Sequence, residues 1–75
     1  MIDTEITDSQ RQRVASDFQQ YAGDEPIRFE QIKACFYAFG SELAVLRILN
    51  KYRWCKKARA GYIENLQTWF FGLEF

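Results

Sequence analysis

Histidine is missing from the sequence, and cysteine is scarce, with only Cys35 and Cys55 present. Without histidine or a CxxC pair, the chain has too few ligands for a zinc site and no imidazole to activate a nucleophile. It also has no glycine-rich phosphate loop. An enzyme is therefore the least expected class, and we expect no cofactor, no metal and no small-molecule substrate.

Long hydrophobic runs, a secretory leader and low-complexity tracts are also missing. Since a membrane-spanning helix needs about 20 apolar residues, we expect a soluble cytoplasmic protein with no membrane partner. The 75 residues fit one small domain over 1–75, in which residues 1–6 show no pattern and are expected to fray. Its core must use the 7 Phe, 4 Tyr and 2 Trp, because so short a chain buries only a modest share of its surface.

An excess of charge is absent too, since 10 basic residues balance 10 acidic ones. The distribution is nevertheless uneven. Seven acidic and three basic residues give residues 1–30 a charge of −4, and the reverse numbers give 31–75 a charge of +4. The acid-free run 47–59 holds Arg47, Lys51, Arg53, Lys56, Lys57 and Arg59. This run predicts a local positive field on a neutral protein.

Capping signals and helical periodicity predict a first helix. Thr7 and Gln10 have the spacing of a capping box, so the helix is expected to begin there. Its predicted apolar face consists of Val14, Phe18 and Tyr21. Gly23 is expected to end it, because glycine readily takes a positive φ.

A second and a third helix are predicted on either side of Gly40. The second is expected to open at Asp24-Glu25-Pro26, and the alternative for residues 27–29 is a short extended piece. Phe29, Ile32, Phe36 and Phe39 recur at offsets of three, seven and ten, which fits one helix face up to Phe39. Gly40 is expected to end this helix in the left-handed conformation, and Ser41 to cap the next. The third helix is expected from Glu42 to about Trp54, with an apolar face of Val45, Ile48, Leu49 and Tyr52.

The opposite face of the third helix suits a partner. It carries Ala44, Arg47, Asn50, Lys51 and Trp54. Arginine reaches base edges, asparagine pairs with adenine and lysine neutralises phosphate, so this face fits a nucleic acid. An ordinary solvated surface explains the same pattern equally well.

Alternation marks the C-terminal segment. In TWFFGLEF, Trp69, Phe71 and Leu73 alternate with Thr68, Phe70 and Gly72, which indicates a half-buried strand. Residues 58–63 are expected to pair with it through a turn at 64–67. A fourth helix competes, because Ile63, Leu66, Phe70 and Leu73 also fit helical spacing. The predicted fold is mainly α with a C-terminal β-hairpin, and the alternative is an all-α four-helix fold.

A helix-turn-helix followed at once by a hairpin resembles the winged helix-turn-helix family. The chain looks most like the small regulators of enterobacterial fimbrial operons, over residues from about 10 to 75. The resemblance is carried by Gly40-Ser41, Val45, Ile48 and the segment from Thr68 to Phe71. It implies a DNA-binding transcriptional regulator whose third helix enters the major groove of double-stranded DNA, and whose wing touches the adjacent groove or backbone.

The resemblance also implies which residues of this sequence contact DNA. On the third helix they are Ser41, Glu42, Ala44, Arg47, Asn50 and Lys51. On the wing they are Lys56, Lys57 and Arg59, together with the turn near Asn65. A homodimer is expected, because one small module covers only a half-site.

A protein-binding module is the competing hypothesis. It would be an inhibitor or co-regulator carried by a mobile element such as a plasmid or phage. The zero net charge, the acidic first thirty residues and the many aromatic residues favour it. The candidate contacts are Trp54, Tyr37 and Tyr62.

Overall fold

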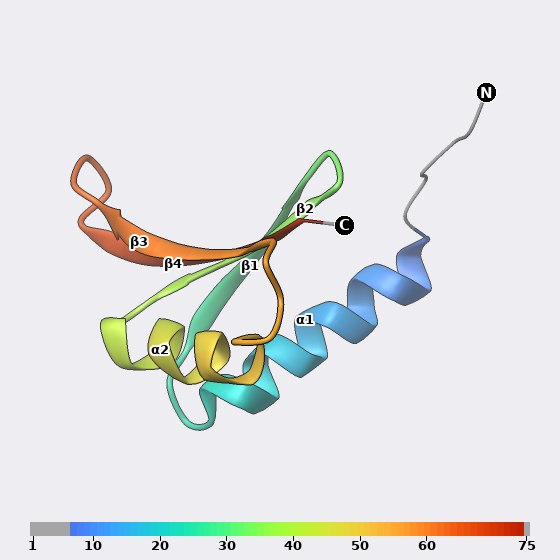
Figure 1. Ribbon diagram of the computed structural model, residues 1–75, viewed down its shortest axis with the longest axis horizontal. Coiled ribbons are helices and arrows are strands. Elements are labelled where there is room, and N and C mark those ends of the chain that lie inside the picture. Colours follow the sequence, from blue (N-terminus) through green and yellow to red (C-terminus); the bar gives the residue numbers. More distant parts are fainter. Residues whose placement is uncertain (1–6, 75) are drawn as a thin grey trace.

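Two helices pack on one face of a four-stranded antiparallel sheet in the computed structural model, which describes residues 7–74 (Figure 1). The elements are α1 (Asp8–Ala22), β1 (Ile27–Ile32), β2 (Cys35–Gly40), α2 (Glu42–Lys51), β3 (Ala58–Ile63) and β4 (Thr68–Glu74). The order helix, strand, strand thus occurs twice. The spatial order of the strands is β1-β2-β4-β3, so the second strand of each hairpin lies in the middle of the sheet.

The core lies between the helices and the sheet. Its largest fully buried side chains are Phe18, Phe36, Phe71, Ile48 and Val45. The ring of Phe18 packs edge-on against three others, with centroid distances of 5.8 Å to Phe29, 5.9 Å to Tyr52 and 5.4 Å to Phe71. Alanines on α1, β2 and α2 are also fully buried, and their small side chains let the layers approach closely.

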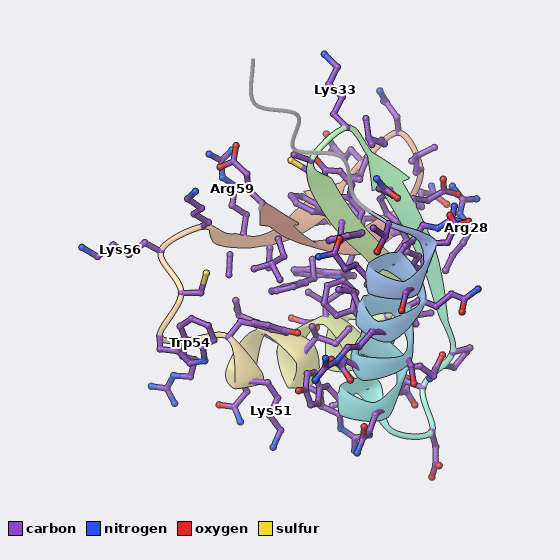
Figure 2. The ribbon with its side chains drawn as sticks, turned by 90° about the vertical axis from the view of Figure 1, so that its right-hand side faces the viewer. Arg28, Lys33, Lys51, Trp54, Lys56 and Arg59 are labelled. Carbon is purple, nitrogen blue, oxygen red and sulfur yellow. The ribbon has the colours of Figure 1, made fainter. Side chains whose placement is uncertain are left out.

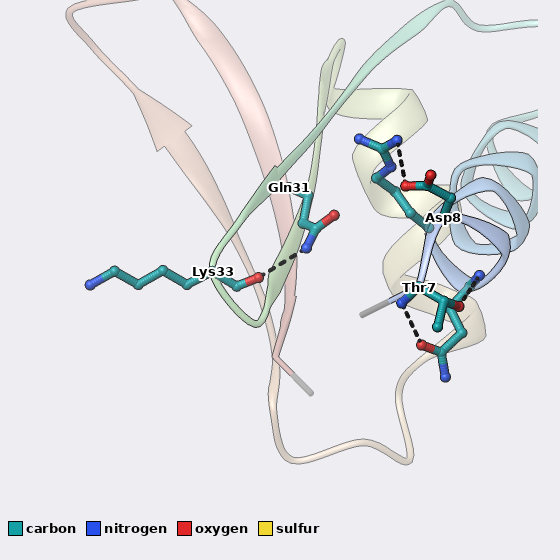
Figure 3. A network of polar contacts seen from close by, with 6 residues as sticks. Thr7, Asp8, Gln31 and Lys33 are labelled. Carbon is teal, nitrogen blue, oxygen red and sulfur yellow. Dashed lines mark hydrogen bonds and ion pairs between the residues drawn. The ribbon is translucent and has the colours of Figure 1, made fainter. Parts of the chain in front are cut away.

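The first helix begins and ends where the sequence predicted. The Gln10 N–H donates to Thr7 Oγ1 at 3.1 Å and the Thr7 N–H donates to Gln10 Oε1 at 3.0 Å, which completes the capping box (Figure 3). At the other end Gly23 has φ +71° and its N–H donates to the carbonyls of Gln19 and Gln20. Local signals therefore predict where this helix begins and ends.

The second helix, α2, is the predicted third one, shortened at its end. The Ser41 hydroxyl accepts from the Ala44 N–H at 3.1 Å, as expected of an N-cap. The helix ends at Lys51 instead of near Trp54, and Tyr52 is its C-cap. Gly40 does not end a helix. It is the last residue of β2, where a β-carbon would lie only 3.0 Å from the Pro26 carbonyl oxygen.

The predicted mainly α fold is wrong, and so is the all-α alternative. Residues 29–39, predicted as a helix, form most of the β1–β2 hairpin, in which Ile27 pairs with Gly40 and Ile32 with Cys35. The structure is an α+β fold with a four-stranded sheet, so the predicted winged helix-turn-helix architecture is not present in residues 7–74.

The helical spacing of residues 29–39 is a coincidence across a tight turn. Phe29 and Phe36 face the core, but Phe39 lies on the other side of the sheet, beside Phe70. The turn at Lys33-Ala34 has neither glycine nor asparagine. Lys33 itself takes φ +56°, and its carbonyl accepts a hydrogen bond of 3.2 Å from Gln31 Nε2 (Figure 3). The usual sequence signal of a two-residue hairpin is therefore missing.

Strands β3 and β4 lie where the sequence predicted paired segments. Ile63 pairs with Thr68 across a turn at 64–67, in which the Gln67 N–H donates to the Glu64 carbonyl at 3.1 Å. Phe71 and Leu73 are buried, as the alternation predicted. The hairpin is half of the main sheet and not an appended wing, because β4 also pairs with β2.

Replacing Phe18 by Ala should lower the free energy of unfolding by about 3–5 kcal/mol, because it removes the ring that packs against three others. Urea denaturation followed by circular dichroism measures the change. The matched control is Leu66→Ala at the β3–β4 turn, where the side chain is 62% exposed, and its effect should stay within about 0.5 kcal/mol. Equal effects of the two substitutions would contradict the assigned core.

Tyr52 should make stability depend on alkaline pH. Burial against Phe18 and Phe71 raises the pKa of Tyr52 to about 12, with further contributions from Tyr21, Asp17 and Cys55. Between pH 10 and 12 the folded state keeps a proton that the unfolded state loses, so the free energy of unfolding should fall as pH rises. Urea unfolding of the native protein and of Tyr52→Phe over this range should show a shallower fall in the variant. Parallel curves would contradict the shift.

Candidate functional site

The face of the sheet opposite the helices, called the open face below, carries a group of aromatic side chains. Directly paired residues share a face, so the register places Tyr37 opposite Gly72, and Phe39 opposite Phe70, on this side. The open face consists of Arg28, Glu30, Ile32, Cys35, Tyr37, Phe39, Arg59, Gly61, Ile63, Thr68, Phe70, Gly72 and Glu74. Figure 1 shows both helices on the other side.

The three rings of the open face are neighbours. The centroids of Tyr37 and Phe39 are 6.1 Å apart with nearly parallel planes, and those of Tyr37 and Phe70 are 6.5 Å apart. All three side chains are half-buried. Their combined surface is an apolar patch in the middle of the open face, and Ile32 and Ile63 extend it.

Two glycines let these rings lie across the adjacent strands. A β-carbon on Gly72 would lie 3.0 and 3.2 Å from two carbons of the Tyr37 ring, and one on Gly61 would lie 3.0 Å from Phe70. The rings therefore occupy the space that side chains at 61 and 72 would take. Each of these two rings has one face against the backbone of a glycine, and its opposite face points away from the sheet.

Cationic side chains flank the rings on both sides. The Arg28 guanidinium, on β1, lies 5.5 Å from the centroid of Phe39 and forms an ion pair of 3.2 Å with Glu30. On the opposite side, Lys57 and Arg59 line a hollow of about 370 Å³ together with the three rings. Figure 2 shows Arg28 and Arg59 at opposite sides of the sheet.

Tyr37 is uncharged at neutral pH. Its pKa is raised above the usual 10.0, first by desolvation and then by a hydrogen bond with Cys35. The charge of Arg59 lowers this pKa and that of Glu74 raises it, so both groups act on the hydroxyl. The open face thus presents a neutral phenol that is subject to the opposite charges of Arg59 and Glu74.

The residues of the predicted third helix that were expected to contact DNA have different surroundings in the structure. Ala44 is fully buried, so it offers no surface to a partner. Ser41 caps α2 and donates a 2.7 Å hydrogen bond to Glu25. Arg47 donates to the Ala22 carbonyl at 3.2 Å, which fastens α2 to the end of α1.

The remaining helix positions are accessible. The Lys51 ammonium lies 5.8 Å from the centroid of the Tyr21 ring. Glu42 and Asn50 are exposed on α2. Of the predicted contacts on this helix, Ala44 alone is buried, while Ser41 and Arg47 are exposed but hydrogen-bonded to other parts of the chain.

The predicted wing residues lie nearer the open face. Lys57 and Arg59 belong to its hollow, while Lys56 is exposed in the segment before β3 and points away from the sheet (Figure 2). Asn65 is exposed in the β3–β4 turn. The acid-free run of basic residues is thus divided between α2, the following segment and the open face.

The three predicted protein contacts are also divided. Tyr37 lies in the aromatic group of the open face. Tyr62 lies on the helix side of the sheet, 5.4 Å from Trp69 between centroids. Trp54, 79% exposed, follows α2, and its indole N–H donates to the Lys51 carbonyl at 3.0 Å.

Sequence reasoning did not assign Arg28, Phe39 or Phe70 to a site. The sequence pattern placed Phe39 on the apolar face of a predicted helix, so it was counted as a core residue and not as a binding residue. The run 35–40 is apolar throughout and carries no alternation, so only its assignment to a strand, with a period of two, separates Phe39 from Phe36.

Other kinds of site lack support within residues 7–74. No group of three or more Cys, Asp or Glu side chains in this part of the chain is placed to hold a metal ion. Neither of its helices is long and apolar enough to cross a membrane. No family model, curated protein or solved structure matches the chain. The open face is therefore the candidate functional site of this protein.

Replacing Gly72 by Ala should lower the free energy of unfolding by about 1–3 kcal/mol, because the new methyl group meets the Tyr37 ring. In a Tyr37→Ala background the same change should be neutral or slightly stabilising, since alanine restricts the unfolded chain more than glycine does. Urea denaturation of the four proteins gives the coupling energy. Additive effects would contradict the position of the ring over Gly72.

Proposed function

We propose that this protein is a non-catalytic nucleic-acid-binding protein whose open face receives a single strand. One observation carries the proposal: the adjacent rings of Tyr37, Phe39 and Phe70 lie along the sheet between cations at both sides. The proposal places the protein in the cytoplasm, without a cofactor.

Stacking is the interaction that the rings support best. Every base has a π-face, and a base stacked on an aromatic side chain contributes about 1–3 kcal/mol to binding. Tyr37, Phe39 and Phe70 offer three ring faces on the two adjacent central strands. Bases in a duplex already stack on one another, so a single strand is the form that can use this surface.

The cations would position the backbone. Arg28 lies on one side of the rings, and Lys57 and Arg59 lie on the other. Three phosphate contacts on a single strand correspond to a log-log salt slope of about −2. Glu30 and Glu74 on the same face limit the attraction, as does the zero net charge. Binding is thus expected to depend on stacking more than on charge.

Regulation of transcription through duplex DNA stays a prediction. Asn50 and Lys51 are exposed on α2, as is Arg47, whose guanidinium is held by the Ala22 carbonyl. Protein binding is the second candidate function. It is favoured by Leu43 and Leu46, two side chains one helical turn apart on α2, which are 47% and 49% exposed.

Alanine at position 37, 39 or 70 should weaken binding of single strands by about 5- to 150-fold, the equivalent of about 1–3 kcal/mol. Fluorescence anisotropy with labelled DNA and RNA oligonucleotides of about 8 nucleotides measures the affinity. Leu66→Ala serves as the control, since this exposed apolar residue is outside the open face. Thermal unfolding of each variant separates lost binding from lost structure.

A duplex of the same sequence distinguishes the candidates. Single strands should bind more tightly than the duplex, and Arg59→Gln should reduce the salt slope by about 0.7. Binding of the duplex alone, lost in Asn50→Ala but retained in Tyr37→Ala, would overturn the proposal in favour of groove reading by α2. Absence of binding at low salt would also overturn it and direct attention to Leu43 and Leu46.

A further inference from the structure

A second hollow lies beside the C-terminal end of β4, on the helix side of the sheet. It has a volume of about 420 Å³ and lies between α1 and the segment that joins α2 to β3. Lys57, Leu73 and Glu74 line both this hollow and the one on the open face. The two hollows therefore adjoin at Lys57 and the C-terminal end of β4, and together they are called the track below.

Trp54 lies along the second part of this track. Its indole N–H is held by the Lys51 carbonyl at 3.0 Å, and its ring lies 6.3 Å from that of Tyr52 between centroids, at an interplanar angle of 42°. The side chain is nevertheless 79% exposed. The hydrogen bond accounts for the polar atom of the side chain and leaves the large apolar ring uncovered.

The charges along the second hollow fit a polyanion only in part. Arg13 and Lys57 line it, but so do Asp17 and Glu74. The exposed Arg53 and Lys56, which flank Trp54 and Cys55 in the sequence, make this end of the track net positive. Figure 2 shows Arg59, Lys56 and Trp54 following one another down the same side of the molecule.

We infer that the bound single strand leaves the open face past Lys57 and stacks a further base on Trp54. This inference depends on the proposed function, and it makes the ligand a strand longer than the open face alone can cover. Trp54 is then a remote stacking residue with its ring held in a fixed position before binding. Pre-formed orientation lowers the entropy lost on binding.

The test compares two lengths of single strand, about 4 and about 12 nucleotides, in anisotropy titrations. Trp54→Ala should weaken binding of the long strand by about 5- to 150-fold and change binding of the short strand by less than about twofold. Trp54→Phe, which keeps a ring but loses the N–H, should retain most of the affinity for the long strand. The native protein and each variant are compared on the same oligonucleotide. The number of positions at which the protein can bind along that strand is therefore the same for both and does not affect the ratio of their affinities.

Fluorescence gives an independent readout. The chain has two tryptophans, and Trp69 lies on the helix side of the sheet. A Trp69→Phe protein therefore reports on Trp54 alone, whose emission should be quenched by the long strand and not by the short one. Leu66→Ala, which lines neither hollow, is the matched exposed apolar control and should bind both strands as the native protein does.

The outcomes separate the two proposals. If the short strand binds and Trp54→Ala leaves the affinity for the long strand unchanged, the extension along the track is wrong and the open face remains the site. If neither strand binds the native protein, both the proposed function and this inference are overturned. An equal loss for both lengths, accompanied by a lower melting temperature, would assign Trp54 a structural role and also overturn the inference.

Discussion

The pairing of β2 with β4 is the constraint on which the rest of the structure depends. Each hairpin forms between neighbouring segments, but only this pairing joins the two into one sheet. Its register places Ala38 opposite Phe71 on the helix side and Tyr37 opposite Gly72 on the open face. A shift of one residue would exchange the two faces and would expose Phe71, which is now fully buried.

The same pairing builds the candidate site. Tyr37 and Phe39 come from β2, and Phe70 comes from β4, so the aromatic group exists only when the central strands meet. The rings also cover Gly61 and Gly72, whose exposed backbone would otherwise weaken the strands. A structural role and a binding role are compatible here, because a ring covers a glycine with one face and offers the other to a partner.

Local signals in the sequence were sufficient for some elements and misleading for others. The capping box at Thr7, the cap at Ser41 and the alternation of residues 68–74 each concern neighbouring residues, and each predicted its element. The β1–β2 hairpin was missed because its turn places Lys33, instead of glycine or asparagine, at a positive φ. The site was missed because the aromatic group joins residues about thirty positions apart, whereas the basic run, compact in the sequence, is divided among three elements.

The repetition of helix, strand and strand has a consequence for how the protein folds. Each unit of one helix and one hairpin has an apolar face, yet Phe18 of the first unit packs on Tyr52 and Phe71 of the second. Neither unit can therefore complete a core by itself. Folding is expected to be cooperative over the whole domain. The entropically costly step is expected to be the pairing of β2 with β4, because the chain between them, which forms α2 and β3, must be closed into a loop.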